Sequence, residues 1–227
     1  MRLGVIGSSG GAALAGAVDC LISGQRGIEL LVVSDRRCGI LEWADRQGYE
    51  NKLIAYADAG TFSAGALDWL QARRVENVLM FFTRRVDSPL LGTVPVFNVH
   101  PSLLPAFPGL HSLEDSISAG ARIVGATLHA ADAGLDTGPI VAQISCGLPL
   151  ECAAETGRRV SYLQKVYLTL LWYELLLDFG LKLDLGPMTI SYSRMPPSAL
   201  CASPCLSDPA LVGAFSALQE KEGCRVI

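Results

Sequence analysis

An amide, an imidazole and a carboxylate in this chain form a set that could do chemistry. Asn98 and His100 alternate at the end of an apolar segment, so both side chains are expected on one face of a strand. Asp136 lies in a short loop with the sequence Gly-Leu-Asp-Thr-Gly-Pro. An amide can donate to an oxyanion, an imidazole can carry a proton, and a carboxylate can orient that imidazole. The set indicates an enzyme.

Each of these residues also has an ordinary structural explanation. A histidine at the end of a strand is often a buried residue with satisfied hydrogen bonds. An aspartate beside glycine is common in turns that bind nothing. Because Asp136 follows His100 at a distance along the sequence, spacing alone does not bring the two side chains together.

The first part of the chain predicts strands alternating with helices. The expected strands cover residues 2–6, 28–33, 53–55, 77–82 and 96–99, and the expected helices cover 12–18, 41–47 and 63–73. This order predicts an α/β fold, a Rossmann-like, mostly parallel twisted sheet with helices on both faces. Asn98 and His100 then lie at the carboxyl end of a parallel strand, where open α/β sheets bind ligands.

The second part of the chain predicts a different pattern. We expect a helix at 112–119, strands at 123–130 and 139–145, a long amphipathic helix at 155–179, an extended segment at 181–192, an irregular segment at 193–207 and a short helix at 207–222. Asp136 falls in the loop between the two strands. We therefore expect a catalytic domain over residues 1–190 and a C-terminal extension of unknown role, a short and mostly irregular tail, over residues 191–227.

Composition excludes several classes of protein. Half of the 227 residues are apolar, which suffices for a sizeable core, yet polar residues interrupt every apolar run before the length of a membrane span. The start of the chain lacks the pattern of an export signal, so a cytoplasmic location is expected. A net charge of −4 with scattered basic pairs argues against nucleic acid as a partner. The chain is compatible with a homodimer.

Cysteine usage argues against a disulfide framework and against a metal site. The seven cysteines are odd in number and widely spread. Only Cys201 and Cys205 approach the spacing of metal ligands, and no second Cys or His pair lies near them in the sequence. We expect no metal in this protein.

A glycine-rich turn follows the first expected strand. In Gly7-Ser8-Ser9-Gly10-Gly11 the free N–H groups at the start of the next helix could hold a phosphate or a carboxylate. A plain tight turn is an alternative. A dinucleotide site is another, with Asp35 as the acid that binds ribose, although the third glycine of that motif is missing.

Several motifs together resemble those of the folate-dependent formyltransferases. They are Asn-Val-His-Pro-Ser-Leu-Leu-Pro at 98–105, Phe-Pro-Gly at 107–109, Gly-Ala-Thr-Leu-His at 125–129 and Leu-Asp-Thr-Gly-Pro-Ile-Val-Ala-Gln at 135–143. The resemblance is dense over residues 76–150 and looser over 1–75 and 150–190. It implies the formyltransferase fold and Asn98, His100 and Asp136 as the catalytic set. It also implies transfer of the formyl group of 10-formyltetrahydrofolate to a small amine through a tetrahedral intermediate.

The resemblance also implies binding residues. The folate would contact residues from two segments, namely Thr83, Arg84, Arg85, Val86, Ala131, Asp132 and Leu135. Either arginine matches the single arginine of the family, and both could instead be surface residues. The acceptor amine would contact Gly10, Gly11, Ala12, Pro101 and Gln164.

Departures from the family pattern concern the acceptor. Enzymes for glycinamide ribonucleotide have Gly-Ser-Asn-Leu where this chain has Gly-Ala-Ala-Leu at 11–14, and no arginine lies near Ser63. A glutamate of those enzymes is matched by Gln164. These changes argue against glycinamide ribonucleotide as the acceptor, but phosphoribosylglycinamide formyltransferase stays an alternative. So do a formyltetrahydrofolate deformylase, which uses the same three residues, and a folate-binding protein without activity. A methionyl-tRNA formyltransferase is disfavoured because residues 187–227 supply no basic domain.

Overall fold

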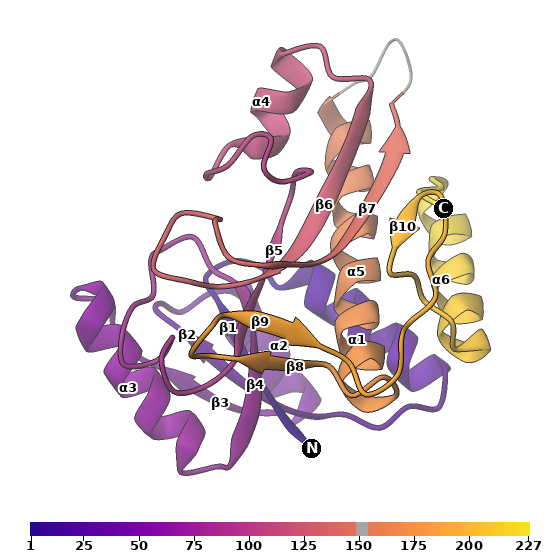
Figure 1. Ribbon diagram of the computed structural model, residues 1–227. Helices are drawn as coiled ribbons and strands as arrows, with labels where there is room; N and C mark the ends of the chain where they lie inside the picture. The colour runs from indigo at the N-terminus through magenta and orange to yellow at the C-terminus, as the bar shows by residue number, and fades with distance from the viewer. Residues whose placement is uncertain (149–153) are drawn as a thin grey trace.

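The computed structural model describes residues 1–148 and 154–227, and Figure 1 shows its central twisted sheet flanked by helices. The strands of this sheet are β1 (Arg2–Gly7), β2 (Glu29–Ser34), β3 (Glu50–Leu53), β4 (Val75–Phe81), β5 (Val96–His100), β6 (Ile123–Ala130), β7 (Ile140–Gly147) and β10 (Ala202–Ser203). The helices are α1 (Ala12–Ser23), α2 (Gly39–Gln47), α3 (Ala59–Gln71), α4 (Ser112–Ser118), α5 (Ala154–Leu177) and α6 (Pro209–Glu222). The predicted α/β class is confirmed.

The order of the strands defines where a ligand can bind. The sheet runs β10-β7-β6-β5-β4-β1-β2-β3, with β1 to β5 parallel and with β6, β7 and β10 each antiparallel to its neighbour. The chain passes from β1 outward to β2 and β3, then returns to β4 on the other side of β1. Such a reversal of direction opens a crevice at the carboxyl ends of the strands.

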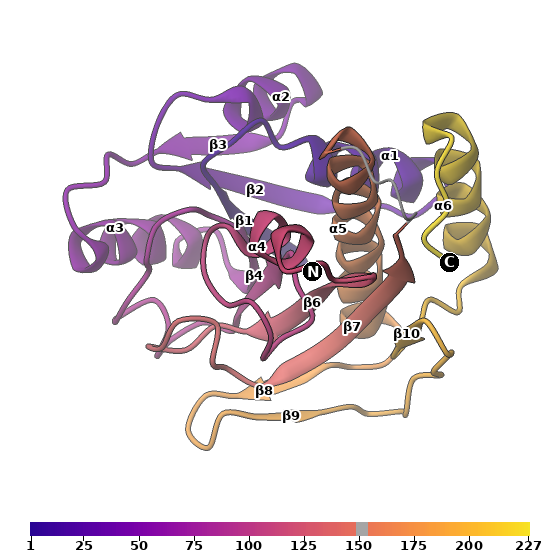
Figure 2. The ribbon, with the colours of Figure 1, turned by 90° about the horizontal axis from the view of Figure 1, so that it is seen from above.

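Helices lie on both faces of the sheet (Figure 2), and apolar residues pack beneath them. On one face, α1, α2, α5 and α6 share a core with side chains such as Val5, Phe97 and Leu128. On the other face, α3 packs through Phe62 and Leu70 against residues of β2, β4 and β5. Strands β1, β2 and β6 are buried on both faces beyond their first residue, which explains why their sequences are almost continuously apolar.

Several element boundaries differ from the expected ones. Strand β3 precedes the segment expected at 53–55, and α3 begins earlier than residue 63 because Asp58 caps it, accepting a hydrogen bond from the Thr61 N–H at 2.8 Å. The extended segment at 181–192 forms a hairpin of β8 (Lys182–Asp184) and β9 (Thr189–Ser191), drawn in front of β1 and β4 in Figure 1. The helix expected at 207–222 is confirmed as α6.

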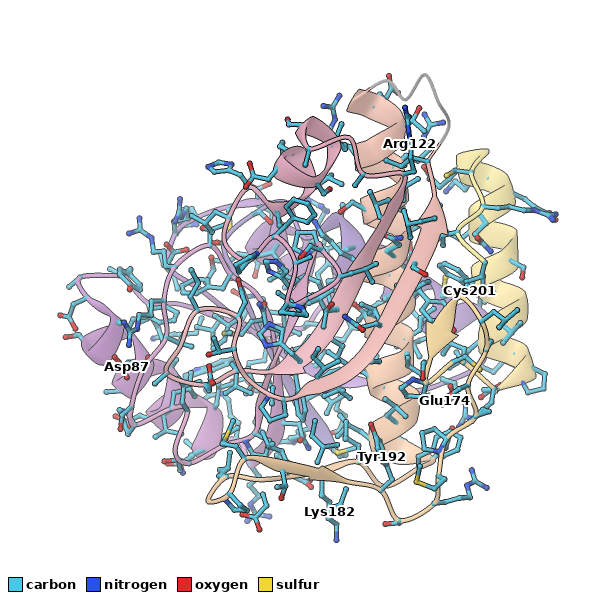
Figure 3. All side chains as sticks on the ribbon, turned by 45° about the horizontal axis from the view of Figure 1, so that its top comes forward. Asp87, Arg122, Glu174, Lys182, Tyr192 and Cys201 are labelled. Atoms are coloured by element: carbon cyan, nitrogen blue, oxygen red, sulfur yellow. The ribbon has the colours of Figure 1, made fainter. Side chains whose placement is uncertain are left out.

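The residues after 190 belong to the same core as the rest of the chain. Strand β10, inside the segment expected to be irregular, pairs with β7, and Leu211 and Phe215 of α6 are fully buried against α1 and α5. The buried carboxylate of Glu174 accepts hydrogen bonds from the hydroxyl and the N–H of Ser207 and from the N–H of Asp208. Figure 3 shows Glu174 on α5 beside this segment. The proposed boundary near residue 190 therefore marks no break in packing.

Three further observations bear on composition. None of the described helices is long and apolar enough to cross a membrane. Among residues 1–148 and 154–227, no group of three or more His, Cys, Asp or Glu side chains could hold a metal ion. The six cysteines within these residues are free thiols, and Cys152 lies outside the described residues.

Candidate active site

The structure brings Asp136 next to His100. Strand β5 ends at His100, and the loop between β6 and β7 returns Asp136 to the same edge of the sheet. The Asp136 Oδ2 atom lies 3.3 Å from His100 Nδ1, and both side chains are almost entirely buried. The juxtaposition that spacing left open is thus present in the fold. We call Asn98, His100 and Asp136 the predicted catalytic set.

The turn at 107–109 holds both members of this pair. The Phe107 carbonyl oxygen lies 3.0 Å from His100 Nε2, and the Gly109 N–H donates to Asp136 Oδ2 at 2.8 Å. Both nitrogens of His100 therefore face oxygen acceptors, and only the imidazolium form can donate to both. Phe107 and Asp136 adopt φ values of 53° and 54°, a left-handed conformation that costs energy in residues with a Cβ atom. This strain lies where it fixes the imidazole and the carboxylate.

His129 is a site residue that the sequence analysis missed. It lies opposite Asn98 across the β5–β6 pairing, and its Nε2 atom is 3.1 Å from Asn98 Nδ2. Burial lowers the pKa of His129, although the Ala130 carbonyl, 3.0 Å from Nδ1, acts in the opposite direction. The neutral ring thus donates from Nδ1 and accepts from Asn98 at Nε2. This contact orients the Asn98 amide and leaves its second N–H for the cleft.

A buried network anchors the turn after β5. The Thr127 hydroxyl donates to the Ser102 carbonyl at 2.7 Å and accepts from the Leu104 N–H at 3.0 Å. The Gln143 amide donates to the Leu104 carbonyl at 2.9 Å and to the Thr127 hydroxyl at 3.0 Å. The threonine and glutamine of the sequence motifs therefore hold the loop that carries the Phe107 and Gly109 contacts.

A single cleft of about 930 Å³ joins the predicted site residues. The predicted catalytic set lines it, as do all seven residues predicted to bind folate: Thr83, Arg84, Arg85, Val86, Ala131, Asp132 and Leu135. Of the residues predicted to bind the acceptor, Gly10, Gly11, Ala12 and Pro101 also line it. Their binding roles stay predictions, but their positions are compatible with one shared site.

The two adjacent arginines have different partners. Arg84 Nε donates to Asp35 Oδ2 at 2.8 Å, and its guanidinium lies 4.8 Å from the centre of the Tyr56 ring. Arg85 donates to the Ala133 carbonyl at 3.1 Å, on the loop that precedes Asp136. Arg85 therefore bridges the two segments predicted to bind folate. Arg84 instead neutralises the Asp35 carboxylate, which follows β2.

Asp35 has little capacity left for a ribose. Its carboxylate is buried and accepts hydrogen bonds from Arg36 at 2.6 Å and from Arg84 at 2.8 Å. A dinucleotide-binding acid must offer its oxygens to the ribose hydroxyls. The two ion pairs argue against the dinucleotide alternative.

The glycine-rich turn is packed tightly and tied to the adjacent strand. Gly11 has a φ of 71°, and a Cβ there would meet Ile40 at 2.8 Å, so glycine is required. The Ser8 hydroxyl accepts from the Thr83 N–H at 3.0 Å, which joins the turn after β1 to the segment after β4. Helix α1 has no side-chain cap and no acidic residue in its first turn. Its first N–H groups are therefore free of local side-chain acceptors.

Gln164, predicted to contact the acceptor, lies outside the cleft in this structure. Gln164 is 1% exposed, does not line the cleft, and donates to the Val124 carbonyl at 3.3 Å on the sheet side of α5. Successive residues of a helix project about 100° apart, so a resemblance in sequence position does not fix the face. The cleft is lined instead by a helical stripe of four residues, Arg158, Ser161, Tyr162 and Lys165. We call these residues the α5 stripe.

The sequence contains a signal for the α5 stripe. Its members follow the i, i+3, i+4, i+7 spacing of one helix face, within a helix whose other faces are mostly apolar. The spacing marks them as a group that faces something other than the core. His129 had a similar signal, because it alternates with Thr127 along β6.

Comparison with known proteins agrees with this geometry. The model of the formyl transferase family matches residues 1–165. A phosphoribosylglycinamide formyltransferase of Mycobacterium tuberculosis is 32% identical over 148 residues, which cover 63% of this chain and 69% of the relative. One from Bacillus subtilis is 37% identical over 92 residues, 39% of this chain and about half (47%) of the relative's own length.

Solved structures give the same result for the fold. Glycinamide ribonucleotide transformylase 1 from Symbiobacterium toebii superposes with a TM-score of 0.76 at 30% identity, covering 85% of this chain and 93% of that one. Phosphoribosylglycinamide formyltransferase from Bacillus halodurans superposes with a TM-score of 0.72 at 27% identity, covering 78% and 96%. From the matched residues and the shared fold, this chain belongs to the formyl transferase family.

Proposed function

We propose that this protein transfers the formyl group of 10-formyltetrahydrofolate to the amine of a small acceptor. The observation that carries the proposal is the contact of His100 with Asp136 at 3.3 Å, beside Asn98, in a cleft large enough for both substrates. Family membership supports the reaction class, and the names of the similar proteins support a formyl acceptor.

In the proposed reaction, the amine attacks the formyl carbon and the formyl oxygen becomes an oxyanion. The free N–H of Asn98 stabilises that charge, and one such donor is worth roughly 100- to 1,000-fold in rate. His100, whose two nitrogens face the Phe107 carbonyl and Asp136, carries a proton. Asp136 holds His100 through their contact and takes part in moving the proton from the amine to the departing folate nitrogen. The C–N bond to the acceptor forms and the C–N bond to the folate breaks.

The folate is assigned to the part of the cleft between residues 82–86 and 131–135. Arg85 joins these segments through the Ala133 carbonyl, and Phe82 and Val86 supply apolar surface. An aromatic ring system with a polar edge suits such a slot, because its faces contact apolar side chains while its edge contacts backbone groups.

Glycinamide ribonucleotide is the alternative acceptor, favoured by the names of the similar proteins. The turn at 10–13 offers no polar side chain to a phosphate, so backbone N–H groups of α1 would have to bind it. Two different functions would use the same cleft without an acceptor, namely hydrolysis of the formyl group and folate binding without turnover.

One assay separates these functions. The protein is incubated with 10-formyltetrahydrofolate, with and without candidate amines that include glycinamide ribonucleotide, and release of tetrahydrofolate is followed. Release that depends on an amine supports the proposal, and the amine used identifies the acceptor. Release without any amine would make the protein a deformylase. Measurable folate binding with no release would leave a binding protein.

A cytoplasmic location and a homodimer, both expected from the sequence, belong to the same proposal. Cell fractionation tests the first, and light scattering of the purified chain tests the second.

A further inference from the structure

The α5 stripe contrasts with the rest of its helix. Neighbouring positions such as Val160, Leu163 and Val166 are at most 3% exposed and pack in the core. Placing hydroxyl and charged groups on one face of so buried a helix is unfavourable unless that face meets polar partners. The face opens into the cleft, next to the start of α1.

Ser161 has an unused hydroxyl at this face. The residue is 4% exposed, it lines the cleft, and its Oγ atom makes no hydrogen bond within residues 1–148 and 154–227. Buried hydroxyls nearly always have a partner in native proteins. The unpartnered oxygen therefore points to a ligand atom at this position.

Two cations flank Ser161 on the same face. Neither the Lys165 ammonium nor the Arg158 guanidinium forms an ion pair with the residues that the structure describes. Lys165 is partly buried, which lowers the pKa of its ammonium, while the Glu114 carboxylate on α4 acts in the opposite direction. A buried ammonium without a hydrogen-bonded partner is unstable until an anion reaches it.

The wall facing the stripe adds to the positive potential. Gly10, Gly11 and Ala12 line the cleft at the start of α1, whose first turn carries no acidic side chain. A helix N-terminus attracts anions through its free N–H groups and its dipole. Among the described residues, Glu114 is the acidic side chain that lines this part of the cleft, since Asp132 and Asp136 belong to the loop on the folate side.

The charges of this part of the cleft match a single negative charge. Of the described residues that line it, Lys165 and Arg158 contribute two formal positive charges and Glu114 one negative charge, which leaves one positive charge in excess. A phosphomonoester carries close to two negative charges at neutral pH, whereas a carboxylate carries one. The Glu114 carboxylate would repel the second charge of a phosphomonoester.

We propose that Lys165, with Ser161 and Arg158, binds a carboxylate of the acceptor, so that the preferred acceptor is a small amine bearing one carboxylate. The inference rests on the proposed function, since it names the acceptor class of the same cleft. It makes Lys165 the residue that selects charged over neutral acceptors. It makes Glu114 the residue that selects a carboxylate over a phosphomonoester.

The test uses three probes that share an aminoethyl group: β-alanine, its neutral amide and phosphoethanolamine. Binding to the full chain and to each variant is measured by isothermal titration calorimetry. In the unmodified protein it is also followed through the NMR signal of the Lys165 side chain, assigned by its loss in Lys165→Met. We expect β-alanine to shift the Lys165 signal and to bind more tightly than the other two probes. In Lys165→Met its affinity falls about 10- to 100-fold, the range for losing a hydrogen bond to a charged group.

Two further variants sharpen the assignment. Glu114→Gln removes the repelling charge, so phosphoethanolamine gains affinity relative to β-alanine. Ser161→Ala weakens β-alanine binding without changing the charge of the site. Lys182→Met is the matched control, because Lys182 lies on the β8–β9 hairpin away from the cleft and loses the same charge (Figure 3). Circular dichroism establishes that each variant is folded.

A failure of this test can be distinguished from a failure of the proposed formyl transfer. Binding is read without formyl transfer, so a protein that transfers no formyl group can still bind β-alanine at Lys165. No shift of the Lys165 signal by any probe, or equal binding of β-alanine and its amide, would overturn the anion site. Tighter binding of phosphoethanolamine than β-alanine by the unmodified protein would overturn the assignment of a carboxylate.

Discussion

The polar side chains on two walls of the cleft differ in whether they are hydrogen-bonded within the protein. On the wall formed by β5, β6 and the 131–136 loop, the side chains of Asn98, His100 and Asp136 are each held by a neighbour. On the α5 stripe, the Ser161 hydroxyl and the Lys165 ammonium have no hydrogen-bond partner among the described residues. Side chains that are hydrogen-bonded within the protein are held in one geometry before the substrate binds. Side chains without such bonds are available to bind a ligand. This difference supports the proposals that the first wall carries the chemistry and that the second binds the acceptor.

The largest expected effect comes from the first wall. Asp136→Asn removes the negative charge that faces His100, so kcat should fall by about 10³- to 10⁴-fold, while folate binding stays within a few-fold. Steady-state release of tetrahydrofolate and fluorescence titration with folate measure the two quantities. Asp184→Asn, a change of the same kind on the β8–β9 hairpin, is the control. A kcat within tenfold of the unmodified protein would remove Asp136 from the chemistry.

Asn98→Ala should have the next largest effect. It removes the amide of a residue that lines the cleft, together with the contact that His129 makes with this amide. Loss of one oxyanion donor predicts a fall in kcat of about 100- to 1,000-fold with a smaller change in KM. The split between kcat and KM is the measurement. A rise in KM at constant kcat would mean that Asn98 binds substrate and does not stabilise the oxyanion.

Thr127→Val tests whether the first wall depends on its buried support. The change leaves the Leu104 N–H and the Gln143 amide each without one hydrogen bond, so the free energy of unfolding should fall by about 2–3 kcal/mol. Urea denaturation followed by circular dichroism gives this value. Thr93→Val on an exposed turn is the control and should change stability by less than about 0.5 kcal/mol. Equal effects at both positions would show that the network is unimportant.

His129 predicts a pH dependence of stability. Burial lowers the pKa of His129 in the folded chain, so the unfolded chain binds the proton more readily. Stability is therefore lost as the pH falls below about 6.5, the ordinary pKa of histidine, and this contribution is constant above it. Unfolding measured from about pH 8 to about pH 5 should show a weaker pH dependence in His129→Gln. An unchanged profile would contradict a neutral, buried ring.

The smallest expected effect belongs to the second wall. Ser161→Ala removes a buried hydroxyl that has no partner, so the free chain should become more stable by up to about 1 kcal/mol. Thermal unfolding without ligand measures it. Ser116→Ala is a useful contrast, because the Ser116 hydroxyl donates to the Leu113 carbonyl at 2.8 Å and its loss should destabilise. If both variants lose stability, Ser161 is bonded in the free protein.

The sequence predicted the strands and long helices because their apolar periodicity is set by burial. It placed α3 late, since the Asp58 cap precedes any clear apolar pattern. It did not anticipate β10, because two residues in a Ser- and Pro-rich segment become a strand only when the edge of β7 is there to pair with. Such an element is determined by its neighbour and not by its own composition.

The sequence predicted which residue types form the candidate site, but it did not predict which way their side chains point. The motifs identified His100 and Asp136, and the β6–β7 connection then supplied the contact that spacing could not. Position along α5 suggested Gln164, but the helix turns that side chain toward the sheet and presents Lys165 to the cleft. A resemblance in sequence identifies which position along the chain corresponds to a residue of the family. Whether that residue faces the cleft or the core depends on how the helix packs.

The contact between α1 and α5 offers a way to change the size of the cleft by mutation. A Cβ atom at Gly16 would lie 2.4 Å from the Tyr162 hydroxyl and 3.2 Å from Val166. A single added methyl group would therefore displace the Tyr162 side chain, which lines the cleft. Gly16→Ala would change the width of the cleft while leaving the identity of every residue that lines it intact. Acceptor preference could therefore be changed at Gly16, a residue that does not itself line the cleft.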